Sequence, residues 1–171
     1  MVCSVVDIEE ALYFYYIGKG CAVCRNCRVS LMGNRPSINC GHCSDAKFEY
    51  WLEGYAERLS KGFETNQYEV DVVVKCDDFL SPPVRLIEVK DHSERPSSYE
   101  LCREVCWHYK KARHLISALG SGRILFATNV QLPDRCTCGE EAVGISQIAT
   151  IPADATTKIN LYEVSAGLFF W

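Results

Sequence analysis

Two β-branched, apolar segments place the strongest constraint on the fold of this chain. Tyr68–Val74 and Arg85–Lys90 each have the composition of a β-strand, and residues 77–83, which are rich in turn formers, separate them. The two segments therefore predict a hairpin. Because side chains alternate along a strand, Glu88 and Lys90 are expected to leave the second strand on the same face.

Asp71 lies within the first segment, and we expect Val70, Val72 and Val74 to occupy the opposite face. A charged acid inside an apolar strand is costly to bury without a partner. A divalent cation is a suitable partner, because hard ions such as Mg²⁺ prefer oxygen ligands. The pattern therefore predicts a cation site between Asp71 and Glu88.

This order of an acidic strand residue, a gap and then Glu-x-Lys resembles the PD-(D/E)XK superfamily of metal-dependent nucleases, which includes archaeal Holliday-junction resolvases and RecB-like enzymes. The matching residues are Asp71, Glu88 and Lys90. Upstream, residues 54–63 are similar to the helix that opens the family core. The resemblance thus covers residues 45–128.

Two features depart from the family pattern. Val70 replaces the proline that often precedes the family's aspartate. The family core also places a three-stranded meander after its first helix, whereas only two strands can be identified between Gly62 and Lys90. Either residues 63–74 contain an additional bend, or the fold is a shortened variant.

The resemblance implies an α/β (α+β) restriction-endonuclease-like core, in which helices flank a mixed sheet. It also implies that the chain hydrolyses DNA phosphodiester bonds with Mg²⁺ or Mn²⁺. Asp71, Glu88 and the main-chain carbonyl of Val89 would coordinate the ion, and Glu57 would bind it directly or through water. Lys90 would orient the attacking water.

Residues 45–61 predict an amphipathic helix that ends at Gly62. Glutamates recur every four residues along one side of this helix. By resemblance, Glu57 is the first candidate to approach the ion, and Glu53 is the second. A solvated acidic stripe is the alternative interpretation.

The eleven cysteines carry the second chemical signal. Two Cys-x-x-Cys motifs flank a short loop, and each could supply two thiolates to a tetrahedral zinc ion. We therefore expect residues 1–44 to form an N-terminal helix and a zinc-knuckle module, ahead of a nuclease core at 45–171. The zinc ligands would be four of five cysteines: Cys21, Cys24, Cys27, Cys40 and Cys43.

Several alternatives to this zinc assignment stay open. The first ligand pair is either Cys21 with Cys24 or Cys24 with Cys27, and disulfides are an alternative to zinc. Some RecB-like nucleases bind an iron–sulfur cluster through cysteines that flank the core. Cys136 and Cys138 could join upstream cysteines in that way.

Capping-box spacings predict two further helices, at 8–17 and at 97–119. The sequence also predicts strands at residues 123–128 and 158–165 and a loop at residues 131–141.

On the helix at 97–119, Arg103, Trp107 and Lys110 follow one another at helical spacing. They offer cations and an aromatic ring where a nucleic-acid backbone could lie, although a solvated face is the alternative. Cys102 and Cys106, one turn apart, are either core thiols or one half of a disulfide.

Length and composition fit one compact domain, with 171 residues of which 48% are hydrophobic. The formal charge of −4 excludes a generally basic nucleic-acid-binding surface, so any contact with DNA must be local. We expect an intracellular protein without a membrane span, since neither an export signal nor a long apolar run is present. The apolar segment 166–171 is expected to dock on the protein or in a homodimer.

A competing hypothesis from another functional class is a non-catalytic zinc-ribbon adaptor that binds nucleic acid or protein. In that case the acidic strand residues would form only ion pairs.

Overall fold

The computed structural model describes residues 7–30, 37–54, 67–76, 84–119, 121–154 and 157–166. Three helices occur in these ranges: α1 (Ile8–Gly18), α2 (Ala46–Gly54) and α3 (Ser98–Leu119). The strands are β1 (Ala22–Ser30), β2 (Ser37–Cys43), β3 (Gln67–Lys75), β4 (Val84–Lys90), β5 (Arg123–Thr128), β6 (Arg135–Cys138), β7 (Glu141–Pro152) and β8 (Lys158–Ala166).

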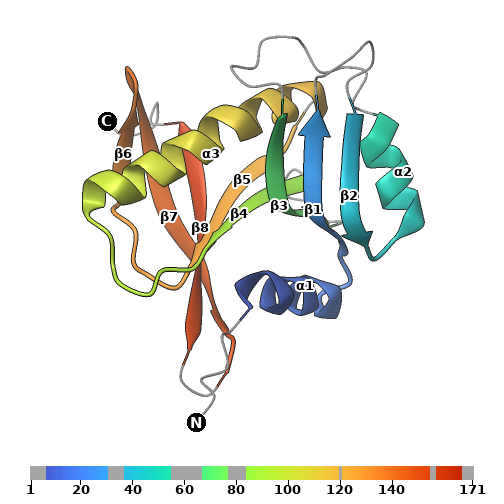
Figure 1. Ribbon diagram of the computed structural model, residues 1–171, viewed down its shortest axis with the longest axis horizontal. Helices are drawn as coiled ribbons and strands as arrows, with labels where there is room; N and C mark the ends of the chain where they lie inside the picture. The colour runs from blue at the N-terminus through green and yellow to red at the C-terminus, as the bar shows by residue number, and fades with distance from the viewer. Residues whose placement is uncertain are drawn as a thin grey trace.

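All of these strands belong to one mixed, open sheet in the order β2-β1-β3-β4-β5-β8-β7-β6 (Figure 1). Neighbouring strands pair antiparallel except β4 and β5, which α3 connects as a parallel pair. The described residues therefore form an α+β fold, which confirms the predicted class at this level.

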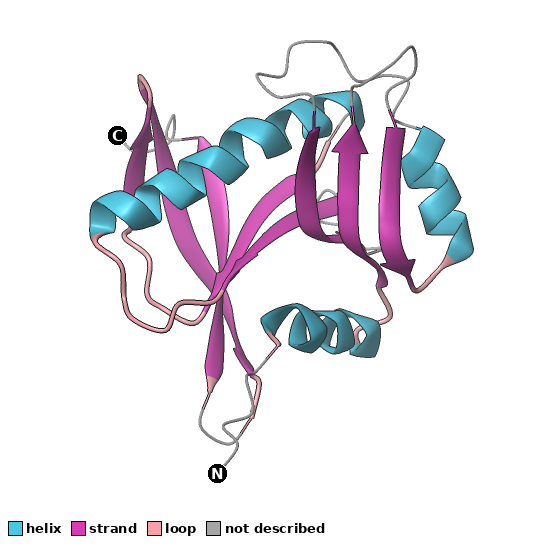
Figure 2. Cartoon of the chain, in the orientation of Figure 1, coloured by secondary structure: helices cyan, strands magenta, loops and turns pink. Residues whose placement is uncertain are grey.

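Helices lie on both sides of the sheet (Figure 2). On one face, α1 buries Leu12 and Tyr16 in a cluster with Val72 of β3. On the other face, α2 and α3 pack on the sheet through apolar stripes that include Leu52 and Leu101. The central strands are thus covered on both faces, which explains their continuous apolar runs.

The predicted strands and helix caps are confirmed where the structure describes them. The Asp7 carboxylate accepts a hydrogen bond from the backbone N–H of Glu10 (3.1 Å), and the Ser97 hydroxyl accepts one from that of Glu100 (3.2 Å). The predicted connection at 77–83, the helix beyond Gly54 and the segment after Ala166 lie outside the described residues.

One predicted loop is wrong. Within the segment 131–141 the chain forms β6, which pairs antiparallel with β7 through a turn at Gly139. Gly139 has a φ of +67°, a conformation that glycine adopts without steric cost. The strand Arg135–Cys138 alternates exposed and buried residues, but its four residues are too few for this alternation to be recognised in the sequence.

The five cysteines predicted to bind zinc are all paired in disulfides in this structure. They lie on or beside strands of the main sheet, not in knuckle turns, and a sulfur in a disulfide is not a thiolate that can bind zinc. The five disulfides are Cys21–Cys76, Cys24–Cys43, Cys27–Cys40, Cys102–Cys136 and Cys106–Cys138.

These pairings confirm the disulfide alternative for both cysteine groups. They also separate Cys136 and Cys138 from the N-terminal cysteines, because α3 supplies the partners of both. The strands before residue 44 join the same sheet as those after it. Disulfides at this density are typical of oxidising compartments and of intracellular proteins from hyperthermophiles.

No helix in the described ranges is both long enough and apolar enough to cross a membrane.

Side chains normally alternate between the two faces of a sheet along each strand. In β1, β2 and β3 this alternation is interrupted at one position in each strand, an irregularity that we call the reset. Asn26 of β1, Gly41 of β2 and Asp71 of β3 lie opposite one another, where the otherwise regular registers skip a pair. Asn26 has a φ of +53°, and a Cβ on Gly41 would lie 3.3 Å from the Asn26 Cβ. The prediction that Val70 and Val72 share a face is therefore wrong: they pack in clusters on opposite sides of the sheet.

Disulfide Cys106–Cys138 ties α3 to β6, so its removal should destabilise the fold. The double variant Cys106→Ser/Cys138→Ser is expected to lower the free energy of unfolding by about 2–4 kcal/mol, because the unfolded chain regains the entropy of the closed loop. Urea unfolding without reductant measures this change. Equal stability of the variant and the oxidised parent protein would contradict it, and the difference should vanish after both are fully reduced.

Candidate functional site

The strands β3 and β4 separate at Asp71. Their backbone ladder runs from the Lys75–Val84 pair to the Val72–Ile87 pair and ends there. Further along, the backbone N–H of Val89 donates to the Asp71 Oδ2 at 2.8 Å. A side-chain carboxylate thus takes the place of a ladder carbonyl, and the Asp71 side chain lies in the opening between the two strands.

Glu88 projects from β4 on the α3 side of the sheet, and its side chain is only 15% exposed. Its Oε1 lies 3.9 Å from the Lys90 Nζ, and its Oε2 lies 3.7 Å from the His108 Nδ1. The other ring nitrogen of His108, Nε2, is 3.2 Å from the Leu86 carbonyl oxygen. Burial lowers the pKa of His108 to about 4, so this ring is neutral at pH 7 and forms no ion pair with Glu88.

Asp71 and Glu88 form an acid pair that retains a proton at neutral pH. Burial and, second, the charge of Asp71 together raise the pKa of Glu88 to about 8, although the charge of Lys90 opposes the shift. Burial also raises the pKa of Asp71, and the two side chains are hydrogen-bonded to each other. Two buried carboxylates that are hydrogen-bonded to each other need a shared proton or a cation, because they cannot both be charged without compensation.

A third acid near the pair comes from α1 and was missed by the sequence analysis. Burial raises the pKa of Glu9, and the charge of Asp71 contributes to this rise. The Arg25 Nε donates to the Glu9 Oε1 at 3.0 Å. Glu9 lies in the first turn of α1, the helix that precedes β1. Its proximity to Asp71 could have been predicted only by recognising that β1 pairs with β3.

The structure describes one of the two helix acids chosen from sequence, and that acid lies away from the pair. Glu57 lies outside the described residues. Glu53 is exposed on α2, which packs on the edge strand β2, two positions from β3.

Lys111 of α3 is a second cation beside the acid pair, also missed from sequence. Burial lowers its pKa, whereas the charges of Glu88 and Asp71 raise it. Its Nζ lies 4.7 Å from the centroid of the Trp107 ring. Lys111 therefore links the acids to the aromatic side chain predicted to contact nucleic acid.

A groove of about 930 Å³ opens beside Glu88 and Lys90, between α3 and the β6–β7 turn. We call it the α3 groove. All three predicted nucleic-acid contacts line it: Arg103, Trp107 and Lys110.

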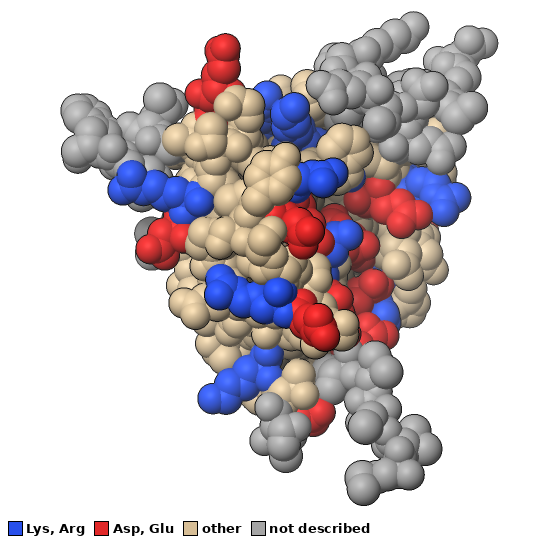
Figure 3. All heavy atoms as spheres, turned by 60° about the vertical axis from the view of Figure 1, so that its left-hand side comes forward, with Lys and Arg blue, Asp and Glu red and all other residues tan. Residues whose placement is uncertain are grey.

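The exposed rings of Tyr99 and Trp107 stand along the α3 groove, with 74% and 50% of their surfaces accessible. Carboxylates also line it, namely those of Glu88, Glu100 and Glu104. Figure 3 shows both basic and acidic side chains on one face of the molecule.

The acid pair supplies two side-chain carboxylates for an ion. Among the described residues, three side-chain ligand atoms within 4.8 Å of one another occur only in the group Cys24, Cys40 and Cys43. The third ligand expected at the acid pair, the carbonyl of Val89, belongs to the main chain and directly follows Glu88. Two carboxylates and a carbonyl are the oxygen donors that Mg²⁺ and Mn²⁺ prefer.

The shared proton should make stability depend on pH. The pKa of Glu88 is raised in the folded state, so its contribution is fully present below about pH 4.5 and is lost as the pH rises to about 8. Glu88→Gln should abolish this dependence, which we expect to be on the order of 2–4 kcal/mol in the parent protein. Urea unfolding of both proteins between about pH 5 and pH 9 tests this. Parallel curves for the two proteins would disprove a shared proton.

Comparison with protein-family models, with curated proteins and with solved structures found no match to this chain.

Proposed function

We propose that this chain is a Mg²⁺- or Mn²⁺-dependent nuclease that hydrolyses DNA phosphodiester bonds. The observation that carries the proposal is the acid pair of Asp71 and Glu88, which retains a proton at neutral pH and lies next to the α3 groove. A divalent cation can replace that proton and compensate both charges, which a proton alone cannot do.

The order of elements supports a restriction-endonuclease-like core. The resemblance calls for a helix followed by a three-stranded meander, and the antiparallel set β1, β3 and β4 supplies three strands after α1. The third strand was hidden from sequence analysis because β2 and α2 are inserted between β1 and β3. In this alignment the acid on the opening helix becomes Glu9 instead of Glu57.

The chain's own groups have distinct roles in the proposed reaction. Asp71, Glu88 and the carbonyl of Val89 would hold the cation, which when bound lowers the pKa of a water ligand and stabilises negative charge on the phosphate. The Lys90 Nζ lies 3.9 Å from the Glu88 Oε1 and would orient the attacking water. Lys111 would offset charge that accumulates on the phosphate.

The α3 groove would carry the DNA strand to the acid pair. Arg103 and Lys110 can contact phosphates, and the exposed rings of Tyr99 and Trp107 can stack on bases. Carboxylates are interspersed among these cations, so the groove would hold DNA through a few specific contacts and not through a broad positive surface. The net charge of −4 agrees with this mode of binding.

Loss of either acid should abolish metal-dependent cleavage. Asp71→Asn and Glu88→Gln are expected to lower the rate by roughly 100-fold or more with Mn²⁺, because each removes an anionic oxygen ligand. Labelled single-stranded, duplex and branched DNA should be tested as substrates, with product lengths read on denaturing gels.

A matched control for these variants is Glu69→Gln on the same strand. Glu69 is exposed and pairs with Arg28 at 3.1 Å, so its loss should change the rate by less than about 3-fold. Isothermal titration of Mn²⁺ completes the test. Unchanged affinity in both acid variants, together with no cleavage of any DNA by the parent protein, would favour the non-catalytic adaptor.

The α3 groove should determine DNA affinity. Trp107→Ala is expected to weaken binding about 10-fold through lost stacking, and Arg103→Ala/Lys110→Ala should reduce the slope of log K against log[salt] by about 0.7 for each lost phosphate contact. Fluorescence anisotropy with Ca²⁺ in place of Mn²⁺ measures both effects. Lys47→Ala, an exposed cation on α2, is the control, and an equal loss in that variant would count against the groove.

A further inference from the structure

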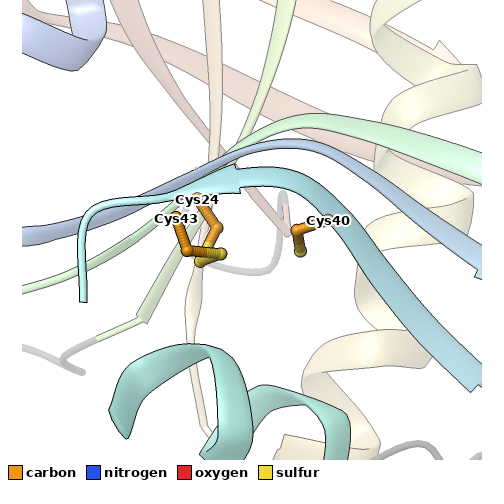
Figure 4. Close-up of side chains that lie close together, drawn as sticks. All are labelled: Cys24, Cys40 and Cys43. Atoms are coloured by element: carbon orange, nitrogen blue, oxygen red, sulfur yellow. A yellow bond between two sulfur atoms is a disulfide. The ribbon is translucent and has the colours of Figure 1, made fainter. Parts of the chain in front are cut away.

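Four cysteines on β1 and β2 form a compact array. The register places Cys24 directly opposite Cys43, and Cys27 directly opposite Cys40. The sulfur atoms of Cys24, Cys40 and Cys43 all lie within 4.8 Å of one another (Figure 4), and Cys27 is bonded to Cys40. The two disulfides are therefore neighbours, and the four sulfurs constitute what we call the four-cysteine cluster.

All four sulfurs lie on the same face of the sheet because of the reset at Asn26 and Gly41. Residues three apart on a regular strand point to opposite faces, which would separate the two cysteines of each Cys-x-x-Cys motif. Here the four cysteines belong to, or pack against, the same apolar cluster as Phe48 and Leu52 of α2. Figure 4 shows the side chains of Cys24, Cys40 and Cys43 projecting from the sheet toward α2.

We propose that the four-cysteine cluster is a redox-controlled zinc site, with two disulfides in the oxidised protein and four zinc-bound thiolates in the reduced protein. Two equivalents of a dithiol reduce the two disulfides, each delivering two electrons and two protons and becoming a disulfide itself. Four cysteine thiols result. Binding of Zn²⁺ then displaces their four protons to solvent.

The distances suit a tetrahedral ion. Zinc–sulfur bonds of about 2.3 Å place the sulfurs of a four-thiolate site about 3.8 Å apart. Three of the sulfurs already lie within 4.8 Å of one another, so reduction followed by small side-chain rotations can provide this geometry.

The ligand set is purely sulfur. His42 directly precedes Cys43 and lies on the other face of β2, where its Nε2 is 3.1 Å from the Tyr13 hydroxyl. An all-thiolate set selects zinc over Mg²⁺ or Mn²⁺, so this site is chemically distinct from the acid pair.

The remaining disulfides serve as internal controls. Cys21–Cys76 joins the chain before β1 to the end of β3, and its sulfurs belong to no three-ligand group among the described residues. The two disulfides between α3 and β6 likewise lie outside such a group. Reduction of these pairs should yield thiols without a high-affinity zinc site.

Metal analysis of the full chain tests the proposal. The protein is reduced under argon with a phosphine, incubated with Zn²⁺, desalted and assayed for zinc, in parallel with oxidised protein. We expect about one zinc ion per chain after reduction and none before it. Co²⁺ in place of Zn²⁺ should give the intense thiolate-to-metal absorption and the visible bands of a tetrahedral site.

Paired serine variants locate the ion. Cys40→Ser/Cys43→Ser should lose zinc, whereas Cys21→Ser/Cys76→Ser should retain it. The cobalt spectrum of the reduced parent protein provides a readout that does not depend on the folding of either variant. The proposal is overturned if reduced parent protein retains no zinc, if its cobalt spectrum lacks thiolate bands, or if the Cys21/Cys76 variant loses zinc as completely as the cluster variant.

Discussion

The reset of side-chain alternation at Asn26, Gly41 and Asp71 is the constraint on which both chemical centres depend. On β3 it separates Val70 from Val72 and leaves the Asp71 carboxylate in the opening beside β4, where it accepts the Val89 N–H. On β1 and β2 it brings four cysteines to one face. A single irregularity, shared by three paired strands, therefore positions an oxygen-rich site and a sulfur-rich site.

The electrostatics of the acid pair follow from where these strands are buried. Helices cover both faces of the sheet, so the carboxylate of Glu88 has little solvent to stabilise its charge. His108 gives no compensation because the same burial keeps it neutral, and Lys90 is 42% exposed, which screens its charge. The pair consequently retains a proton. A divalent cation has to displace this proton to bind, and it then compensates the charges of both carboxylates.

Short-range patterns predicted the parts of the fold that local chemistry determines. β3, β4 and α3 were identified because β-branched runs and capping residues act within a few positions. β1 and β2 were not, because two Cys-x-x-Cys motifs are equally consistent with zinc knuckles and with paired strands, and only the long-range pairing of β1 with β3 decides between them. Glu9 was missed for the same reason, since its proximity to Asp71 depends on that pairing.

The proposed contact with DNA benefits from preorganisation, because a net charge of −4 supplies no general attraction to phosphates. The disulfides Cys102–Cys136 and Cys106–Cys138 tie α3 to β6 on either side of Arg103, and sulfurs from both line the α3 groove. The position of α3, with its cationic and aromatic side chains, is therefore fixed by folding and disulfide formation. A ligand that binds in the α3 groove does not have to supply the free energy for ordering this helix. Since carboxylates are interspersed among the cations, a DNA strand in the proposed complex would gain little from general attraction and more from fitting this fixed row. Affinity should accordingly depend on the groove's geometry more than on the overall charge of the protein.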